Sequence, residues 1–283
     1  MPDRRTFLKT LSAGALGAAG LACDARGATT RAAGTLDRIG VQLYTVRQAM
    51  GDDFEGTLRR VAAIGYAEVE FAGYFGRPPA AVRSVLDDVG LRAPSAHVSY
   101  EVLGDDWGPI LETANVVGHD YLICPGLPRS VTESIAGYQR VADVFNRAGE
   151  RAREAGISFG YHNHAAEFAL LEGQVPYDVL TAESDSQDVL LQMDLFWIIR
   201  GGRDPLEYFS RYPGRFPSVH VKDMDGLPNG AMVDVGQGSI NFAAIFAERE
   251  SAGIRHFFVE HDRPAEQFES IRVSYEYLEG LRF

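Results

Sequence analysis

The sequence lacks the features that mark several classes of protein. It has only two cysteines, Cys23 and Cys124. Because Cys23 lies in the N-terminal segment discussed below, the rest of the chain has one thiol and forms no internal disulfide. Lys and Arg together number 27 against 39 Asp and Glu, for a net charge of −12. That balance argues against nucleic acid or an anionic membrane as a partner, since both need clustered positive charge.

What remains is the composition of an ordinary globular protein. Apolar residues make up 46% of the 283 residues, which is enough to bury a large core without disulfides or a partner subunit. The aromatic, glycine and charged fractions lie near globular averages, which excludes disordered and collagen-like chains.

The first residues resemble a twin-arginine export signal. The motif Asp3-Arg4-Arg5-Thr6-Phe7-Leu8-Lys9 is followed by an apolar run over residues 11–22, which is too short to span a bilayer as a stable helix. We therefore predict a signal peptide and linker over residues 1–34 and a single catalytic domain over residues 35–283.

The end of this leader has two interpretations. Leu21-Ala22-Cys23 resembles a lipoprotein box, although Gly20 stands where such boxes usually have Leu. Lipid attachment at Cys23 and ordinary cleavage before about Thr29 both stay open. Either outcome predicts an exported protein, in the periplasm or lipid-anchored at the cell envelope.

The rest of the chain repeats one unit, in which a β-branched or aromatic run ends in polar residues and precedes an amphipathic stretch. The predicted strands lie at residues 39–43, 67–71, 93–97, 121–124, 157–161, 189–193, 218–221 and 256–259. Predicted helices at residues 53–64, 80–89, 110–117, 131–155 and 241–252 are each followed at once by glycine, a typical helix end.

Alternating strands and helices imply parallel pairing, and eight such units in about 250 residues predict an α/β fold of the (β/α)₈ TIM-barrel type. A doubly wound open sheet would need a glycine-rich phosphate loop after the first strand. Residues 42–45, Gln-Leu-Tyr-Thr, contain no glycine.

Polar residues collect at the predicted carboxyl ends of the strands, where TIM barrels carry their active sites. The set is Glu70, His97, His162, His164, Glu167, Asp194, His220, Lys222, Asp223, Glu260, His261 and Asp262. Residues two apart on a strand share a face, so His162 is expected to point with His164, and His220 with Lys222. Mixed imidazole and carboxylate ligands favour one Mn²⁺, Zn²⁺, Co²⁺ or Fe²⁺ ion over Mg²⁺.

Taken in order, these motifs resemble the xylose isomerase-like superfamily of sugar isomerases and epimerases. The resemblance runs from Ile39 to about Leu281. It rests on Tyr161-His162-Asn163-His164-Ala165-Ala166-Glu167-Phe168, Met193-Asp194, His220-Val221-Lys222-Asp223, Gly236-Gln237-Gly238 and Val259-Glu260.

The resemblance implies four metal ligands at the ends of strands five to eight, commonly Glu, Asp, His and Glu. Carried over to this chain, the last three fall on Asp194, His220 and Glu260. The first falls on or near His162, where the family usually has Glu. In the family's epimerases the two Glu ligands also serve as acid and base, so His162 weakens the case for two-base epimerisation. His164 and Glu167 are the alternatives for the missing ligand or base.

The implied chemistry is removal of a proton α to a ketone, with the metal stabilising an enediolate. Glu260 or His164 is the predicted base. Lys222 is predicted to stabilise oxyanion charge, although a salt bridge to Asp223 or Glu260 would explain it equally well.

Three further residues are predicted to contact substrate. Glu70 and His97 would hydrogen-bond sugar hydroxyls, with loop anchoring as the alternative. Trp197, together with Trp107 and Phe196, would form an apolar wall, with core packing as the alternative.

The predicted function is a metal-dependent isomerase or epimerase. Export separates the protein from cytoplasmic sugar phosphates, so the expected substrate is a free sugar or keto-sugar. The alternative is a lyase or hydratase that acts on a 3-keto-glycoside by β-elimination. A non-catalytic sugar-binding barrel is a third possibility, but it would not need the Asp194, His220 and Glu260 group. Apurinic endonucleases share the barrel but need a basic DNA-facing surface.

Overall fold

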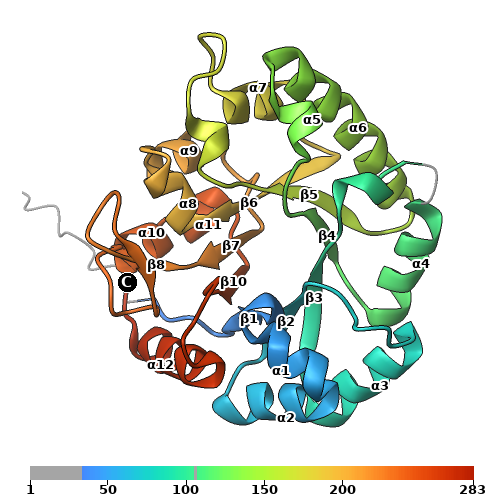
Figure 1. The fold of residues 1–283 in the computed structure, drawn as a ribbon, viewed down its shortest axis with the longest axis vertical. Coiled ribbons are helices and arrows are strands. Elements are labelled where there is room, and N and C mark those ends of the chain that lie inside the picture. The colour runs from blue at the N-terminus through green and yellow to red at the C-terminus, as the bar shows by residue number, and fades with distance from the viewer. Residues whose placement is uncertain (1–33, 105–106) are drawn as a thin grey trace, which may run out of the picture. The chain divides into compact units, whose positions relative to one another are not determined.

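The computed structural model describes residues 34–104 and 107–283, and within them eight parallel strands close into a barrel (Figure 1). The strands are β1 (Gly40–Gln42), β2 (Glu68–Phe71), β3 (Arg92–His97), β4 (Tyr121–Cys124), β5 (Ser158–His162), β6 (Val189–Asp194), β7 (Ser218–Val221) and β10 (His256–Val259). Neighbours in the barrel follow chain order, and β10 closes it against β1. This confirms the predicted TIM barrel as a single domain; the predicted leader lies outside the described residues, apart from Gly34.

Helices surround the barrel (Figure 1). They are α1 (Arg47–Asp52), α2 (Phe54–Ile64), α3 (Pro79–Val89), α4 (Trp107–Val117), α5 (Arg129–Thr132), α6 (Ile135–Glu154), α7 (Pro176–Glu183), α8 (Leu195–Arg200), α9 (Pro205–Arg211), α10 (Phe242–Ala247), α11 (Arg249–Ala252) and α12 (Gln267–Gly280). Short 3₁₀ turns occur at η1 (Leu43–Val46), η2 (Tyr100–Val102) and η3 (Ala166–Phe168), and β8 (Asp223–Asp225) pairs with β9 (Ala231–Val233) in a hairpin. Among the described residues, no helix has the length and apolar character needed to cross a membrane.

The five glycines predicted to end helices all have positive φ, a conformation that glycine adopts without strain. Two predicted helices are divided. The stretch over residues 131–155 breaks where Ser134 caps α6 by accepting a hydrogen bond from the Gly137 amide at 3.2 Å. The stretch over residues 241–252 breaks at Glu248, between α10 and α11.

Alternate strand residues point into the barrel and form layers of different polarity. In the barrel interior, Gly40 and Gly160 leave space for larger neighbouring side chains. A Cβ at Gly40 would lie 2.6 Å from the Phe258 ring, and one at Gly160 would lie 2.8 Å from Cδ1 of Ile123.

Towards the carboxyl ends of the strands the interior becomes polar. Gln42, Glu70, Ser95, Gln192 and His220 are all buried there, and they are contributed by five different strands. Buried polar groups require hydrogen-bond partners. This layer, which we call the cross-barrel layer, forms the floor of the site described next.

Candidate active site

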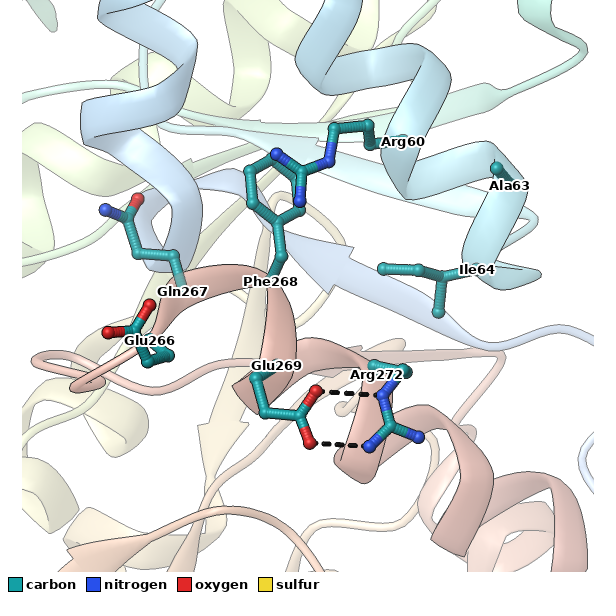
Figure 2. A pocket seen from close by; sticks show the side chains of 8 residues that line it. All are labelled: Arg60, Ala63, Ile64, Glu266, Gln267, Phe268, Glu269 and Arg272. Atoms are coloured by element: carbon teal, nitrogen blue, oxygen red, sulfur yellow. Dashed lines mark hydrogen bonds and ion pairs between the residues drawn. The ribbon is translucent and has the colours of Figure 1, made fainter.

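A cavity of about 460 Å³ opens at the carboxyl ends of the strands. Its lining consists of Tyr44, Ala72, His97, Ser99, Pro125, His162, His164, Lys222, Glu260, Asp262 and Arg263. A larger hollow of about 680 Å³ lies outside the barrel between α2 and α12, where Arg60 lies over the Phe268 ring and Glu269 pairs with Arg272 (Figure 2). The groups of potential metal ligands found among the described residues both lie in the barrel, so the chemistry belongs to the smaller cavity.

Asp194, His220 and Glu260 place ligand atoms within 4.8 Å of one another, and all three are buried. Asp194 ends β6 and caps α8, with Oδ1 accepting from the Trp197 amide at 2.9 Å. Its other oxygen, Oδ2, is buried and lies 3.1 Å from Nζ of Lys222, but no contact within the part of the chain described gives it a hydrogen bond of good geometry. Burial raises the pKa of Asp194 although Lys222 acts in the opposite direction.

His220 lies between two carboxylates. Its Nδ1 is 2.6 Å from Oε2 of Glu260, and its Nε2 is 2.5 Å from Oε2 of Glu70. Burial alone would lower the pKa of His220, but these two carboxylates raise it to about 10. Contacts with Lys222 and His220 hold the pKa of Glu260 below its usual range despite burial.

Lys222 is one of only two lysines in the chain, and the other is Lys9. Its Nζ contacts Glu260 at 2.8 Å, Asp262 at 2.7 Å and Asp194 at 3.1 Å, while the side chain is 2% exposed. Burial opposes its charge, but the three carboxylates raise the pKa of Lys222 above its usual value. Lys222 is therefore a fixed positive charge at the cavity wall, and its salt bridge runs to Glu260 and not to Asp223.

His162 supplies the β5 side of the site. Its Nδ1 is 3.1 Å from Oε1 of Gln192, and its Nε2 is 3.6 Å from Oδ2 of Asp194. Burial and nearby positive charge lower the pKa of His162 well below its usual value, so the ring is neutral. A neutral imidazole has a free lone pair, which a metal ligand requires.

Glu70, predicted to contact substrate, does not reach the cavity. The side chain is fully buried in the cross-barrel layer and does not line the cavity. Its Oε2 lies 3.1 Å from Nε2 of His97 and 2.5 Å from Nε2 of His220, so this carboxylate supports the two histidines from below. His97 does line the cavity, as expected of a substrate-binding residue.

Of the other predicted site residues His164, Glu167 and Trp197, one lines the cavity. His164 lines the cavity, and its ring centroid is 5.0 Å from that of His162. Glu167 does not, because η3 directs it to the Tyr161 hydroxyl, which donates to it. Trp197 is half-buried beside His164 and is not among the cavity-lining residues.

The other two aromatic residues of the predicted wall are core residues. Trp107 is fully buried and donates its indole N–H to the Ala148 carbonyl at 3.0 Å, and Phe196 is 2% exposed. The expected sugar-facing wall of Trp107, Phe196 and Trp197 is therefore wrong for the first two residues.

Asp223 explains why two of the sequence motifs occur together. Its carboxylate accepts hydrogen bonds from four backbone amides, those of Met224 at 2.8 Å, Gly236 at 2.9 Å, Gly238 at 3.0 Å and Ile240 at 3.2 Å. A Cβ at Gly238 would lie 2.3 Å from Oδ1 of Asp223, so the loop approaches this carboxylate closely enough to need glycine. The role of Asp223 is structural, one residue after Lys222.

Sequence reasoning missed Gln42, Ser95 and Gln192. These polar residues lie within predicted strands, and their only signal was a polar side chain on the inward face. Asp262 was noticed but given no role, and the structure pairs it with Lys222 at 2.7 Å.

The donor set fits a divalent cation. A cation beside Asp194 would give Oδ2, which lies beside Lys222 without a well-formed hydrogen bond, a further partner, and it would offset the burial that raises the pKa of that carboxyl. Imidazole and carboxylate donors together suit Zn²⁺, Mn²⁺, Fe²⁺ or Co²⁺. Behind His220, Glu70 provides the carboxylate that metal-binding histidines usually contact through their second nitrogen.

Residues 58–280 match the family model described as xylose isomerase-like TIM barrel. The chain therefore belongs to this family. The matched segment contains every candidate ligand named above, from His162 to Glu260.

Among the proteins similar to this chain, inosose dehydratase from Lacticaseibacillus casei is 24% identical over 237 residues. That alignment covers 71% of this chain and 78% of the relative. Inosose dehydratase from Geobacillus kaustophilus (strain HTA426) is 24% identical over 241 residues, covering 70% and 77%. These relatives indicate an enzyme of the isomerase or lyase type.

Solved structures agree on the fold. A sugar phosphate isomerase/epimerase from Parabacteroides distasonis ATCC 8503 is 28% identical with a TM-score of 0.75, covering 92% of this chain and 98% of that one. The IOLI protein, whose structure holds a zinc atom, has a TM-score of 0.68 at 15% identity, covering 86% and 98%. The second likeness shows the fold alone.

Proposed function

We propose that this protein is a metal-dependent lyase that eliminates water or another β-substituent from a non-phosphorylated keto-sugar. The inosose dehydratase relatives support this reaction type over the isomerisation predicted first. Isomerisation or epimerisation by the same α-proton abstraction is the alternative.

The observation that carries the proposal is where the acid/base groups lie. Within the described ranges, the carboxylates that line the cavity are Glu260 and Asp262, and both follow β10. The part of the lining at the end of β5 presents the imidazoles of His162 and His164 and no carboxylate. Two-base epimerisation in this family uses a Glu on each side, whereas elimination needs only one base and a path for its proton.

His162, Asp194, His220 and Glu260 would hold the metal, and binding would displace a proton from His220, whose pKa the two carboxylates raise to about 10. A divalent ion there supplies Lewis-acid polarisation of a ketone oxygen, which acidifies the adjacent C–H bond. The mixed donor set suits Zn²⁺, Mn²⁺, Co²⁺ or Fe²⁺.

The chain's own groups account for the remaining steps. His164, at the cavity edge, takes the proton from the α-carbon. As the new C=C bond forms, the C–O bond at the β-carbon breaks, and the same imidazole returns its proton to the departing oxygen. The products are an α,β-unsaturated ketone and water, so the atoms balance. The fixed charge of Lys222 stabilises negative charge that develops on the ketone oxygen.

Charge at the cavity supports a substrate without phosphate. Lys222 is already paired with three carboxylates, and Arg263 is the one arginine among the cavity-lining residues. Glu260 and Asp262 would repel a phosphate group at the same wall.

The test is proton NMR in D₂O with EDTA-treated protein resupplied with Zn²⁺, Mn²⁺ or Co²⁺ and given inosose or a 3-keto-glucoside. We expect an unsaturated ketone, with loss of the β-substituent, only when metal is present. Interconversion of ketose and aldose without loss of a substituent would support the isomerase alternative. Turnover that is unaffected by EDTA, or no turnover with any substrate, would contradict the proposal.

A further inference from the structure

Glu70 is the centre of the cross-barrel layer, where it accepts hydrogen bonds from four side chains and lies within 3.1 Å of a fifth. Oε1 accepts from the Ser95 hydroxyl at 2.5 Å and from Nε2 of Gln192 at 2.8 Å. Oε2 accepts from Nε2 of Gln42 at 2.8 Å and from Nε2 of His220 at 2.5 Å, and Nε2 of His97 lies 3.1 Å away. With donors on both oxygens, this side chain acts as an acceptor only.

The orientation of the Gln192 amide follows from Glu70. Because the carboxylate only accepts, the NH₂ group of Gln192 must face it, and the same group donates to Oγ of Ser218 at 3.0 Å. The amide oxygen therefore points the other way, towards two histidines. It lies 3.0 Å from Nε2 of His97 and 3.1 Å from Nδ1 of His162.

An amide oxygen has no proton to give, so both ring nitrogens must donate to it. We infer that Gln192 is a positioning residue that fixes His162 as the Nδ1–H tautomer, holds His97 through its Nε2–H, and so leaves Nε2 of His162 unprotonated beside Asp194. That nitrogen is 3.6 Å from Oδ2 of Asp194. Use of Nε2 as a metal donor rests on the proposed function, whereas the tautomer does not.

This assignment has a chemical consequence for His162. A neutral imidazole free in water prefers the proton on Nε2, and the bond made by the other nitrogen decides the tautomer in a protein. Without Gln192, His162 would place a proton where the metal donor is needed. By accepting a hydrogen bond from Nδ1, the Gln192 amide therefore determines that Nε2 of His162 is the nitrogen available to a metal.

The first experiment uses the full chain, ¹⁵N-labelled at histidine and stripped of metal with EDTA. Long-range ¹H–¹⁵N spectra distinguish the two neutral tautomers, and single His→Asn variants assign the signals. We expect His162 to be neutral with a protonated Nδ1. A protonated Nε2 on neutral His162 overturns the inference, and this result needs no folded variant.

The second experiment compares Gln192→Met, which keeps the length but removes the amide, with Ser95→Ala, which removes a Glu70 donor that touches neither histidine. We expect Gln192→Met to shift His162 towards the Nε2–H tautomer and Ser95→Ala to leave it unchanged. An unchanged tautomer in Gln192→Met overturns the inference.

Titration with Zn²⁺ against a chromophoric chelator separates this inference from the proposed function. We expect Gln192→Met to weaken Zn²⁺ binding by about 10- to 100-fold, as loss of a partner behind a metal ligand does, and Ser95→Ala to change it by less than about 3-fold. If the tautomer shifts as expected but wild-type protein binds no Zn²⁺, the role of Gln192 stands and the metal-dependent function fails.

Discussion

Oε2 of Glu70 lies 2.5 Å from Nε2 of His220, and both side chains are fully buried. This contact puts a carboxylate behind the imidazole that also faces Glu260. Together with His97 it lowers the pKa of Glu70 well below its usual value, against the effect of burial, and it helps to raise the pKa of His220. The buried Glu70 carboxylate thus fixes the orientation of the His220 ring and favours its protonated form.

The first prediction concerns Glu70→Gln. The substitution keeps the shape but replaces an acceptor oxygen by an NH₂ group that must face a donor, and it leaves His220 with one carboxylate. Removing one partner from a buried ion pair costs about 3–5 kcal/mol, so we expect a loss of this order in the free energy of unfolding. Urea denaturation measures it.

The control is Glu55→Gln, at an exposed pair on α2 with 3.6 Å between charges, and it should change stability by less than about 0.5 kcal/mol. Equal stability of the two variants would contradict the assigned role.

The barrel was predictable because its signals are local. Short β-branched runs, helices ended by glycine and polar strand ends each depend on a few neighbouring residues, and the glycines predicted to end helices have the positive φ expected. Breaks inside predicted helices were missed, because Ser134 resembles an ordinary helical surface residue until its capping hydrogen bond is seen.

The site was harder to predict, because its depth depends on register between strands. Alternation shows that Glu70 points inward, but only the pairing of β2 with its neighbours shows that it lies below the cavity. Glu167 follows the same motif as His162 and His164, yet η3 turns it away to Tyr161. Gln192 has no spacing signature, and its importance appears only when Glu70, His97 and His162 are placed around it.

The second prediction concerns Asp223→Ala. Four backbone amides would lose their acceptor, and buried hydrogen bonds to a charged group contribute about 1.5–3 kcal/mol each at most. Because the loop can relax and hydrate, we expect a total loss of about 2–4 kcal/mol and faster proteolysis between residues 226 and 240. Asp225→Ala, two residues on at an exposed position, is the control and should behave like wild type. An unchanged cleavage rate in Asp223→Ala would contradict this role.

The third prediction concerns export, which depends on residues outside the described structure. We propose that the Arg4-Arg5 pair directs twin-arginine transport. Cell fractionation with the native leader should place the protein in the envelope or periplasm. Replacing both arginines by lysine should retain it in the cytoplasm, and mass spectrometry of the exported chain would show whether Cys23 carries lipid. Unchanged export of the double variant would contradict the proposal.

The fourth prediction concerns Cys124, which is buried at the end of β4 with Sγ 3.3 Å from the Gly126 carbonyl. Burial raises the pKa of its thiol to about 12. Because the thiolate is the reactive form, a Cys23→Ser chain should react with a thiol reagent at pH 8 only through opening of the fold. The labelling rate should rise steeply with urea, in step with loss of circular dichroism. Rapid labelling of the native protein would show that the β4 end is accessible.

His119 is a buried histidine outside the active site, held by two partners. The Ala93 carbonyl, 2.6 Å from Nδ1, can only accept, so Nδ1 carries the proton and Nε2 accepts from the Tyr74 hydroxyl at 2.8 Å. Burial lowers the pKa of His119 to about 4, although the Ala93 carbonyl, Glu70 and Asp120 act in the opposite direction. The folded protein therefore keeps this ring neutral.

The fifth prediction follows from the sign of that shift. In the unfolded chain His119 has a pKa of about 6.5, so below that pH the unfolded state binds a proton that the folded state refuses. Stability is thus retained above about pH 6.5 and falls as the pH drops towards 4, by about 2 kcal/mol between pH 7.5 and 5 from this group.

His119→Asn, which keeps a donor for Ala93, should be less stable at neutral pH but lose less stability on acidification. Tyr74→Phe, which keeps the buried imidazole, should be destabilised yet retain most of the pH dependence. Urea denaturation at several pH values measures the slopes, and a wild-type slope in His119→Asn would show that another group is responsible.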